Sequence, residues 1–158
     1  MSDIRPTTNR LPWPPIVYLA AIAISIILGF LYPLPWISAP LSDILFAAGW
    51  LIVAAALAIL FSAIRTMKRA KTTLNPNGIP DHFVTTGPFS FSRNPMYLAN
   101  TLMMIGIGFV SQIAWFIPMA ILAAFVTGKI AIEREEKLLE ERFGKKYRDY
   151  AKRVRRWI

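Results

Sequence analysis

The chain has 158 residues, enough for one domain, and 55% of them are hydrophobic whereas only 17% are charged. Soluble domains carry about 25% charged residues, so this composition argues against a soluble protein. The net charge of +9 does not indicate a nucleic-acid partner, because the cations flank apolar stretches where they suit anionic lipid headgroups. The absence of cysteine and the single histidine exclude disulfides, thiolate metal sites and a histidine-rich metal centre.

Three long stretches contain no Asp, Glu, Lys, Arg or His: residues 11–42, 44–64 and 94–128. A helix needs about 20 largely apolar residues to cross a bilayer. The third stretch would be about 52 Å long as one helix, so we expect it to form a hairpin that turns near Ser111. The sequence therefore predicts about four membrane spans, at 14–32, 44–64, 95–111 and 113–132.

The first span ends at Pro33, and it could alternatively be read as a cleaved signal peptide. The apolar stretch is too long for that reading and lacks a small-x-small cleavage site before Pro33. With four spans, all 18 Lys and Arg residues fall on one side, because the connections at 33–43 and 111–112 contain none. The positive-inside rule then predicts that both termini are cytoplasmic.

Polar segments surround the last two spans. Residues 72–94 form a loop rich in Pro and Gly, and we expect Asn94 to cap the helix that begins at Pro95. The fourth span is expected to continue as a charged helix to about Arg142, and Gly144 to stop it. A short helix at 145–156 is expected along the membrane surface with its aromatic side chains towards the interface. The predicted fold class is all-α, with 1–158 as a single domain and cytoplasmic helices at 133–158.

Two blocks of sequence carry more specific information. Residues 81–97 read DHFVTTGPFSFSRNPMY, and a second block, EREEKLLEERFGKKYRDY, begins at Glu133. In sequence and order they resemble the isoprenylcysteine carboxyl methyltransferase and phospholipid methyltransferase family of integral membrane enzymes. The resemblance implies an all-helical membrane methyltransferase that uses S-adenosylmethionine as its cofactor.

The second block implies the position of the cofactor's carboxylate partner. In the family, a pair of glutamates precedes a Phe-Gly-x-x-Tyr-x-x-Tyr segment, which is matched here by Phe143, Gly144, Tyr147 and Tyr150. Counting back from this segment places the cofactor glutamate on Glu135, which would accept hydrogen bonds from the ammonium group.

The first block is similar to the family's His-x-Leu-Val-Thr-x-Gly pattern followed by Arg-His-Pro-x-Tyr. The resemblance implies a catalytic set of Arg93, Arg134 and Glu135, and no metal. It implies the following cofactor-binding residues: Asp81, His82, Phe83, Val84, Gly87, Phe89, Asn94, Pro95, Met96, Tyr97, Glu135 and Glu136.

The chain departs from the family pattern at several positions. Asn94 stands where many relatives have histidine, and the first histidine of the loop pattern falls on Asp81, with His82 next to it. Which of these two residues contacts the cofactor stays open. Ala131 stands where prenylcysteine enzymes have an arginine for the acceptor's carboxylate, although Arg134 or Lys129 could substitute for it.

These departures favour the short bacterial members of the family, in a bacterial inner membrane. The expected acceptor is a lipid-like or small apolar molecule with a nucleophilic oxygen, nitrogen or sulfur, and membrane lipids are the only other expected partners. The oligomeric state stays open. Two alternatives are an NADPH-dependent sterol-type membrane reductase and a non-catalytic membrane adaptor.

Three further positions have readings that need no catalytic function. Glu133 suits a solvated helix face, where it could pair with Lys137 four residues later. Gly106 and Gly108 in the third span would allow close helix packing, or leave room for a lipid tail.

Overall fold

The computed structural model describes residues 13–71 and 83–158. These residues form helices and no strand, as predicted from the sequence. The elements are α1 (Trp13–Leu31), α2 (Leu41–Arg69), the 3-10 helix η1 (Gly87–Ser90), α3 (Pro95–Ser111), α4 (Phe116–Thr127), the π-helical turn η2 (Gly128–Ile132), α5 (Glu133–Phe143) and α6 (Lys145–Arg153). The candidate residues Asp81 and His82 lie outside the described residues.

Three helical segments are long and apolar enough to cross a membrane: Pro14–Leu31, Leu41–Arg69 and Phe116–Phe143. Four spans were predicted, and three segments reach the full length. The remaining one, helix α3, is apolar but has only 17 residues. Helix α2 is longer than the expected 44–64. Its first turn contains Asp43 and its last turn Lys68 and Arg69, charges that suit the two ends of the helix dipole.

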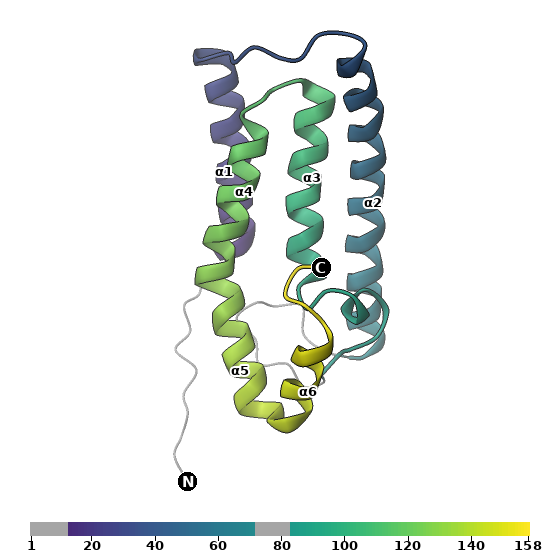
Figure 1. Ribbon diagram of the computed structural model, residues 1–158. Helices are drawn as coiled ribbons and strands as arrows, with labels where there is room; N and C mark the ends of the chain where they lie inside the picture. The colour runs from purple at the N-terminus through teal and green to yellow at the C-terminus, as the bar shows by residue number, and fades with distance from the viewer. Residues whose placement is uncertain (1–12, 72–82) are drawn as a thin grey trace.

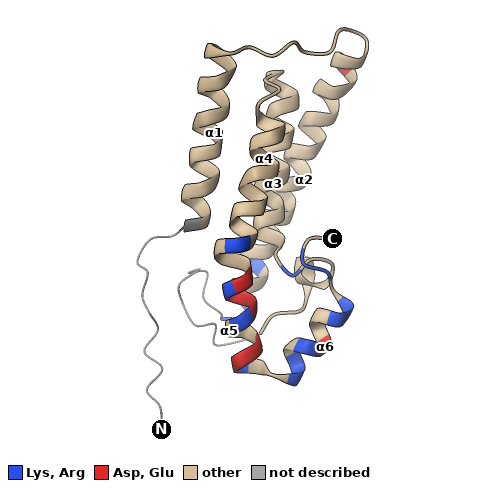
Figure 2. Cartoon of the chain, turned by 60° about the vertical axis from the view of Figure 1, so that its left-hand side comes forward, with Lys and Arg blue, Asp and Glu red and all other residues tan. Residues whose placement is uncertain are grey.

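The long helices lie side by side in a row. Helix α4 packs between α1 and α3, and α3 packs between α4 and α2 (Figure 1). Helix α5 continues α4 beyond the end of α3, and α6 folds back beneath the bundle. The basic residues gather at the end of the molecule that holds α5 and α6 (Figure 2). Polar chemistry is therefore concentrated at one end of an apolar bundle.

Small residues bring α2 and α3 close together. The buried positions of α2 are Ser42, Gly49, Ala56 and Ala63, which recur every seven residues and so share one face. A Cβ on Gly49 would lie 2.9 Å from the carbonyl oxygen of Gly106, and one on Gly106 would lie 2.8 Å from Cγ2 of Val53. Glycine therefore permits a contact of backbone on backbone, the packing that small residues provide between apolar helices.

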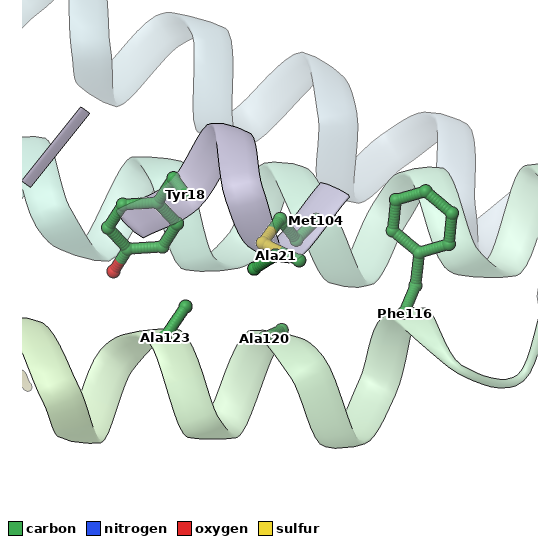
Figure 3. Close-up of a cluster of buried hydrophobic side chains, with 6 residues drawn as sticks. All are labelled: Tyr18, Ala21, Met104, Phe116, Ala120 and Ala123. Atoms are coloured by element: carbon green, nitrogen blue, oxygen red, sulfur yellow. The ribbon is translucent and has the colours of Figure 1, made fainter. Parts of the chain in front are cut away.

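Small residues also line the contact of α4 with α1 and α3. Figure 3 shows six buried side chains from these three helices: Tyr18, Ala21, Met104, Phe116, Ala120 and Ala123. Gly108 of α3 belongs to the same contact, because a Cβ there would lie 2.7 Å from Cβ of Phe116. The packing reading of Gly106 and Gly108 is confirmed.

Gly49→Val should destabilise the bundle by about 1–3 kcal/mol, because the new side chain meets backbone atoms that cannot move aside. Thermal unfolding of the detergent-purified protein measures this loss. Gly128→Ala is the matched control, since a Cβ at Gly128 meets no atom within 4 Å. Equal unfolding temperatures for the Gly49→Val variant and the parent would contradict the close approach of α2 and α3.

Candidate functional site

Tyr97 and Glu135, which come from the two separate sequence blocks, meet in the structure. The hydroxyl of Tyr97, in the first turn of α3, donates a hydrogen bond to Oε1 of Glu135 at 2.6 Å. Both residues are half-buried. Among the described residues, no cation lies within ion-pair distance of the Glu135 carboxylate. A carboxylate held partly out of water without a cation is an acceptor suited to a positively charged ligand.

The π-helical turn η2 joins α4 to α5, the helix that presents Glu135 to Tyr97. On α4 the buried positions include Ala120, Ala123 and Thr127. The wider π turn takes up one additional residue, so the buried face passes through Ala131 and Ile132 to reach Glu135.

Sequence reasoning did not predict this π turn. The signal at this point is Gly128, which weakens the α-helical preference. Arg134, a residue of the expected catalytic set, is exposed, whereas Glu135 is half-buried.

Glu136, the second glutamate of the pair, is held by two arginines. It accepts hydrogen bonds from Nη2 and Nε of Arg156 at 2.7 and 3.1 Å, and its Oε1 lies 3.3 Å from Nη1 of Arg93. The side chains of Glu136 and Arg93 are 15% and 16% exposed. The hydrogen bonds that Arg156 donates to Glu136 raise the pKa of Arg156, so its guanidinium stays ionised. The geometry of the cluster is that of an internal ion-pair network.

Tyr147 and Tyr150 of α6 pack on the loop before α3. The ring of Phe83 stacks on Phe143, with a centroid distance of 5.4 Å, and makes edge contacts with Tyr147 and Tyr150 at 5.7 and 5.1 Å. Both tyrosines are 4% exposed, as is expected of core residues. Burial raises the pKa of Tyr150 to about 12, which keeps its hydroxyl protonated as a donor to the carbonyl of Phe89.

The prediction that the aromatic side chains of the last helix face the membrane interface was wrong. Tyr147, Tyr150 and Val154 are buried within the protein, because Phe83 and Phe143 offer them an apolar partner surface. Phe83, which was expected to flank the cofactor's adenine, is a member of this aromatic cluster.

Other candidate residues of the loop shape the chain before α3. Gly87 adopts a positive φ of 60°, and a Cβ there would lie 2.7 Å from Oγ1 of Thr66, so glycine is required at this turn against α2. Pro95 is buried at the start of α3, while Val84 and Met96 are half-buried.

Asn94 does not cap α3 with its side chain, contrary to the prediction. Its Nδ2 donates instead to the carbonyl oxygen of Arg156 at 3.1 Å, and its backbone N–H donates to Oγ of Ser92 at 3.2 Å. The side chain of Asn94 therefore binds the C-terminal tail and not the first turn of α3. The expected pair of Glu133 with Lys137 is also replaced, because Nζ of Lys129 lies 2.8 Å from Glu133.

A surface groove of about 500 Å³ runs beside these ion pairs, between α5 and α6. Its lining includes Arg93, Glu136, Tyr147 and Arg156, but neither Tyr97 nor Glu135. The charged groove and the Tyr97–Glu135 pair are therefore separate features, although helix α5 contributes residues to both.

Residues 44–146, more than half of the chain, match the family model described as phospholipid methyltransferase. The matched segment runs from α2 into α6 and includes both Tyr97 and Glu135. No curated protein matches the chain. The match agrees with the resemblance carried by the two sequence blocks, and the chain belongs to the phospholipid methyltransferase family of membrane methyltransferases.

Proposed function

We propose that this protein is an S-adenosylmethionine-dependent methyltransferase that works at the cytoplasmic face of a bacterial inner membrane. Its acceptor would be a lipid-like or small apolar molecule. Membership of the family supports the reaction class. The observation that carries the proposal is the half-buried carboxylate of Glu135, which has a tyrosine donor and no cation near it among the described residues.

The candidate site residues offer a partner for each group of the cofactor. The Glu135 carboxylate suits the ammonium, and the first N–H groups of α3, at Met96 and Tyr97, suit the carboxylate of the methionine moiety. Val84, and Phe83 from the edge of its aromatic cluster, would offer an apolar surface to adenine. Asp81 and His82 remain candidate contacts of the same loop. When bound, S-adenosylmethionine supplies an electrophilic methyl group.

The protein's own contribution is to orient the reactants and to exclude water. An in-line displacement depends mainly on the alignment of the reacting atoms, and Tyr97 holds Glu135 in one orientation through a short hydrogen bond. The apolar surfaces of α3 and α4 adjoin this site, so a lipid-soluble acceptor would reach it from the bilayer. Arg134 is exposed on α5 and is the candidate for an anionic group of that acceptor, while Arg93 would act by organising Glu136.

Four crossings of the membrane are part of the proposal, with both termini and residues 65–93 in the cytoplasm. All Lys and Arg residues then avoid the outer connections. The chain contains no cysteine, so single-cysteine labelling reads the orientation directly. An impermeant thiol reagent added outside spheroplasts should label Ser38→Cys and leave Ala70→Cys unlabelled. External labelling of Ala70→Cys would refute this orientation.

Glu135→Gln should weaken binding of S-adenosylhomocysteine. The substitution keeps the size of the side chain but removes a charged hydrogen-bond acceptor, at a cost of about 1.5–3 kcal/mol. This corresponds to a loss of affinity of roughly ten- to a hundredfold, measured by calorimetry in detergent. Glu141→Gln, an exposed position on the same helix, is the control and should bind like the parent.

Calorimetry with NADPH separates the rival functions in the same experiment. A reductase would bind NADPH, and a non-catalytic adaptor would bind neither ligand. Equal binding of S-adenosylhomocysteine by the Glu135→Gln variant and the parent would show that the wrong glutamate has been assigned.

The acceptor should be extractable into organic solvent. Membranes that contain the protein, incubated with methyl-labelled S-adenosylmethionine, should carry the enzyme-dependent label in the lipid extract. Membranes with the Glu135→Gln variant provide the background. Label found only in soluble protein or nucleic acid would overturn the proposed acceptor class.

A further inference from the structure

The C-terminal tail runs back across the end of α3 instead of leaving the molecule (Figure 1). The backbone N–H of Arg93 donates to the carbonyl oxygen of Arg155 at 3.0 Å. The carbonyl oxygen of Arg156 accepts a hydrogen bond from Nδ2 of Asn94 at 3.1 Å, and a longer one from Oγ of Ser92 at 3.5 Å. Residues 154–156, which we name the C-terminal strap, are thus bound through their main chain to the residues that lead into α3.

The side chain of Arg156 points the other way, to α5. Its Nη2 and Nε form two hydrogen bonds with the two oxygens of Glu136, and its Nη1 lies 3.9 Å from Glu133. Paired hydrogen bonds between a guanidinium and a carboxylate fix both distance and orientation. Arg156 therefore joins the entry of α3 to α5, one end through its backbone and the other through its side chain.

This connection matters because α3 and α5 do not pack along each other. Helix α5 extends past the end of α3, and the main backbone contacts of α5 are with η2 and α6 (Figure 1). Yet the hydrogen bond from Tyr97 to Glu135 spans these two helices. Tyr97 lies one turn after Arg93 and Asn94, and Glu135 is the neighbour of Glu136. The strap thus connects positions adjacent to both halves of the Tyr97–Glu135 pair.

We propose that Arg156 is a positioning residue, which holds α5 at the separation from α3 at which Glu135 meets Tyr97. Through Glu135 it sets the affinity for the cofactor without touching the cofactor. The inference rests on the proposed function for its effect on binding, while the mechanical link between the strap, α3 and α5 stands independently of it.

A tail that only adds stability would behave differently. An ion pair as exposed as that of Arg156, whose side chain is 37% exposed, contributes little to the free energy of folding. The partner Glu136 is 15% exposed, so loss of Arg156 perturbs a more buried carboxylate next to the site. A positioning role changes the affinity of the folded protein, whereas a stabilising role changes only its unfolding temperature.

The test compares Arg156→Met with Arg155→Met, its neighbour in the strap, whose side chain is exposed. Hydrogen exchange followed by mass spectrometry should show faster exchange at 92–97 and 133–139 in Arg156→Met, with the apolar helices unchanged. The affinity for S-adenosylhomocysteine, measured well below the unfolding temperature, should fall about three- to tenfold. Arg155→Met should match the parent in both measurements, and Arg156→Lys should lie between parent and Arg156→Met.

A double variant shows whether Arg156 acts through Glu135. Because the two effects then share one path, Glu135→Gln/Arg156→Met should bind about as weakly as Glu135→Gln alone. Additive losses would overturn the proposal, as would unchanged exchange at both segments or unchanged affinity of the folded Arg156→Met variant. If Arg156→Met does not fold, Arg156→Lys decides by the same criteria. A different result is that the parent fails to bind S-adenosylhomocysteine while Arg156→Met still exchanges faster than the parent at both segments. That result would reject the proposed function, whereas the mechanical link between the strap, α3 and α5 would stand.

Discussion

The carboxylate of Glu136 is the point at which three distant segments of the chain meet. Arg93 reaches it from the loop before α3, Arg156 reaches it from the C-terminal strap, and Glu136 itself belongs to α5. A carboxylate this well shielded from water is stable as an ion only with cations beside it. Conversely, the two arginines have no comparable reason to converge without it. The ion-pair cluster therefore organises the polar end of the molecule, where α5, α6 and the loop would otherwise share few contacts with the apolar bundle.

The two glutamates next to each other on α5 have opposite environments. Glu136 lies between cations, whereas Glu135 has a tyrosine hydroxyl and no cation within the described part of the chain. The π turn at Gly128–Ile132 lies directly before α5 and takes up about one additional residue relative to an α-helical turn. Two adjacent glutamates on one helix thus differ in the groups beside them, and Glu135 is the one that contacts Tyr97.

The apolar part of the molecule supports this arrangement by holding α3 firmly. Helix α3 packs on α2 through the glycine contact at Gly49 and Gly106 and on α4 through Gly108. Tyr97 at the end of α3 is therefore mounted on a well-packed helix, while Glu135 is mounted on a helix that extends past the bundle. Glu135 is thus the less supported partner of the pair, and its helix requires additional bonds. The strap provides them through Arg156 and Glu136.

The sequence alone determined the class of the protein and the end of the bundle at which its polar residues gather (Figure 2). Uncharged stretches of sufficient length require helices in an apolar environment, because only a helix satisfies its own backbone hydrogen bonds there. The grouping of charges at the ends of those stretches placed the polar site, and two short motifs indicated the family that the match over 44–146 established. Tyr97 and Glu135 were both identified as site residues in this way, although their contact was not.

Only the tertiary structure decided how the polar residues pair. Local pattern suggested that Asn94 caps a helix, that Glu133 pairs with Lys137, and that Tyr147 and Tyr150 face the membrane. The first and the last of these expectations failed because a segment remote in sequence supplied a competing partner: Arg156 for Asn94, and Phe83 for the two tyrosines. Glu133 pairs with Lys129, four residues before it, instead of Lys137, four residues after it. Hydrogen bonds and ring contacts between residues far apart along the chain depend on how helix ends meet in space, and periodicity within one helix contains no information about that meeting.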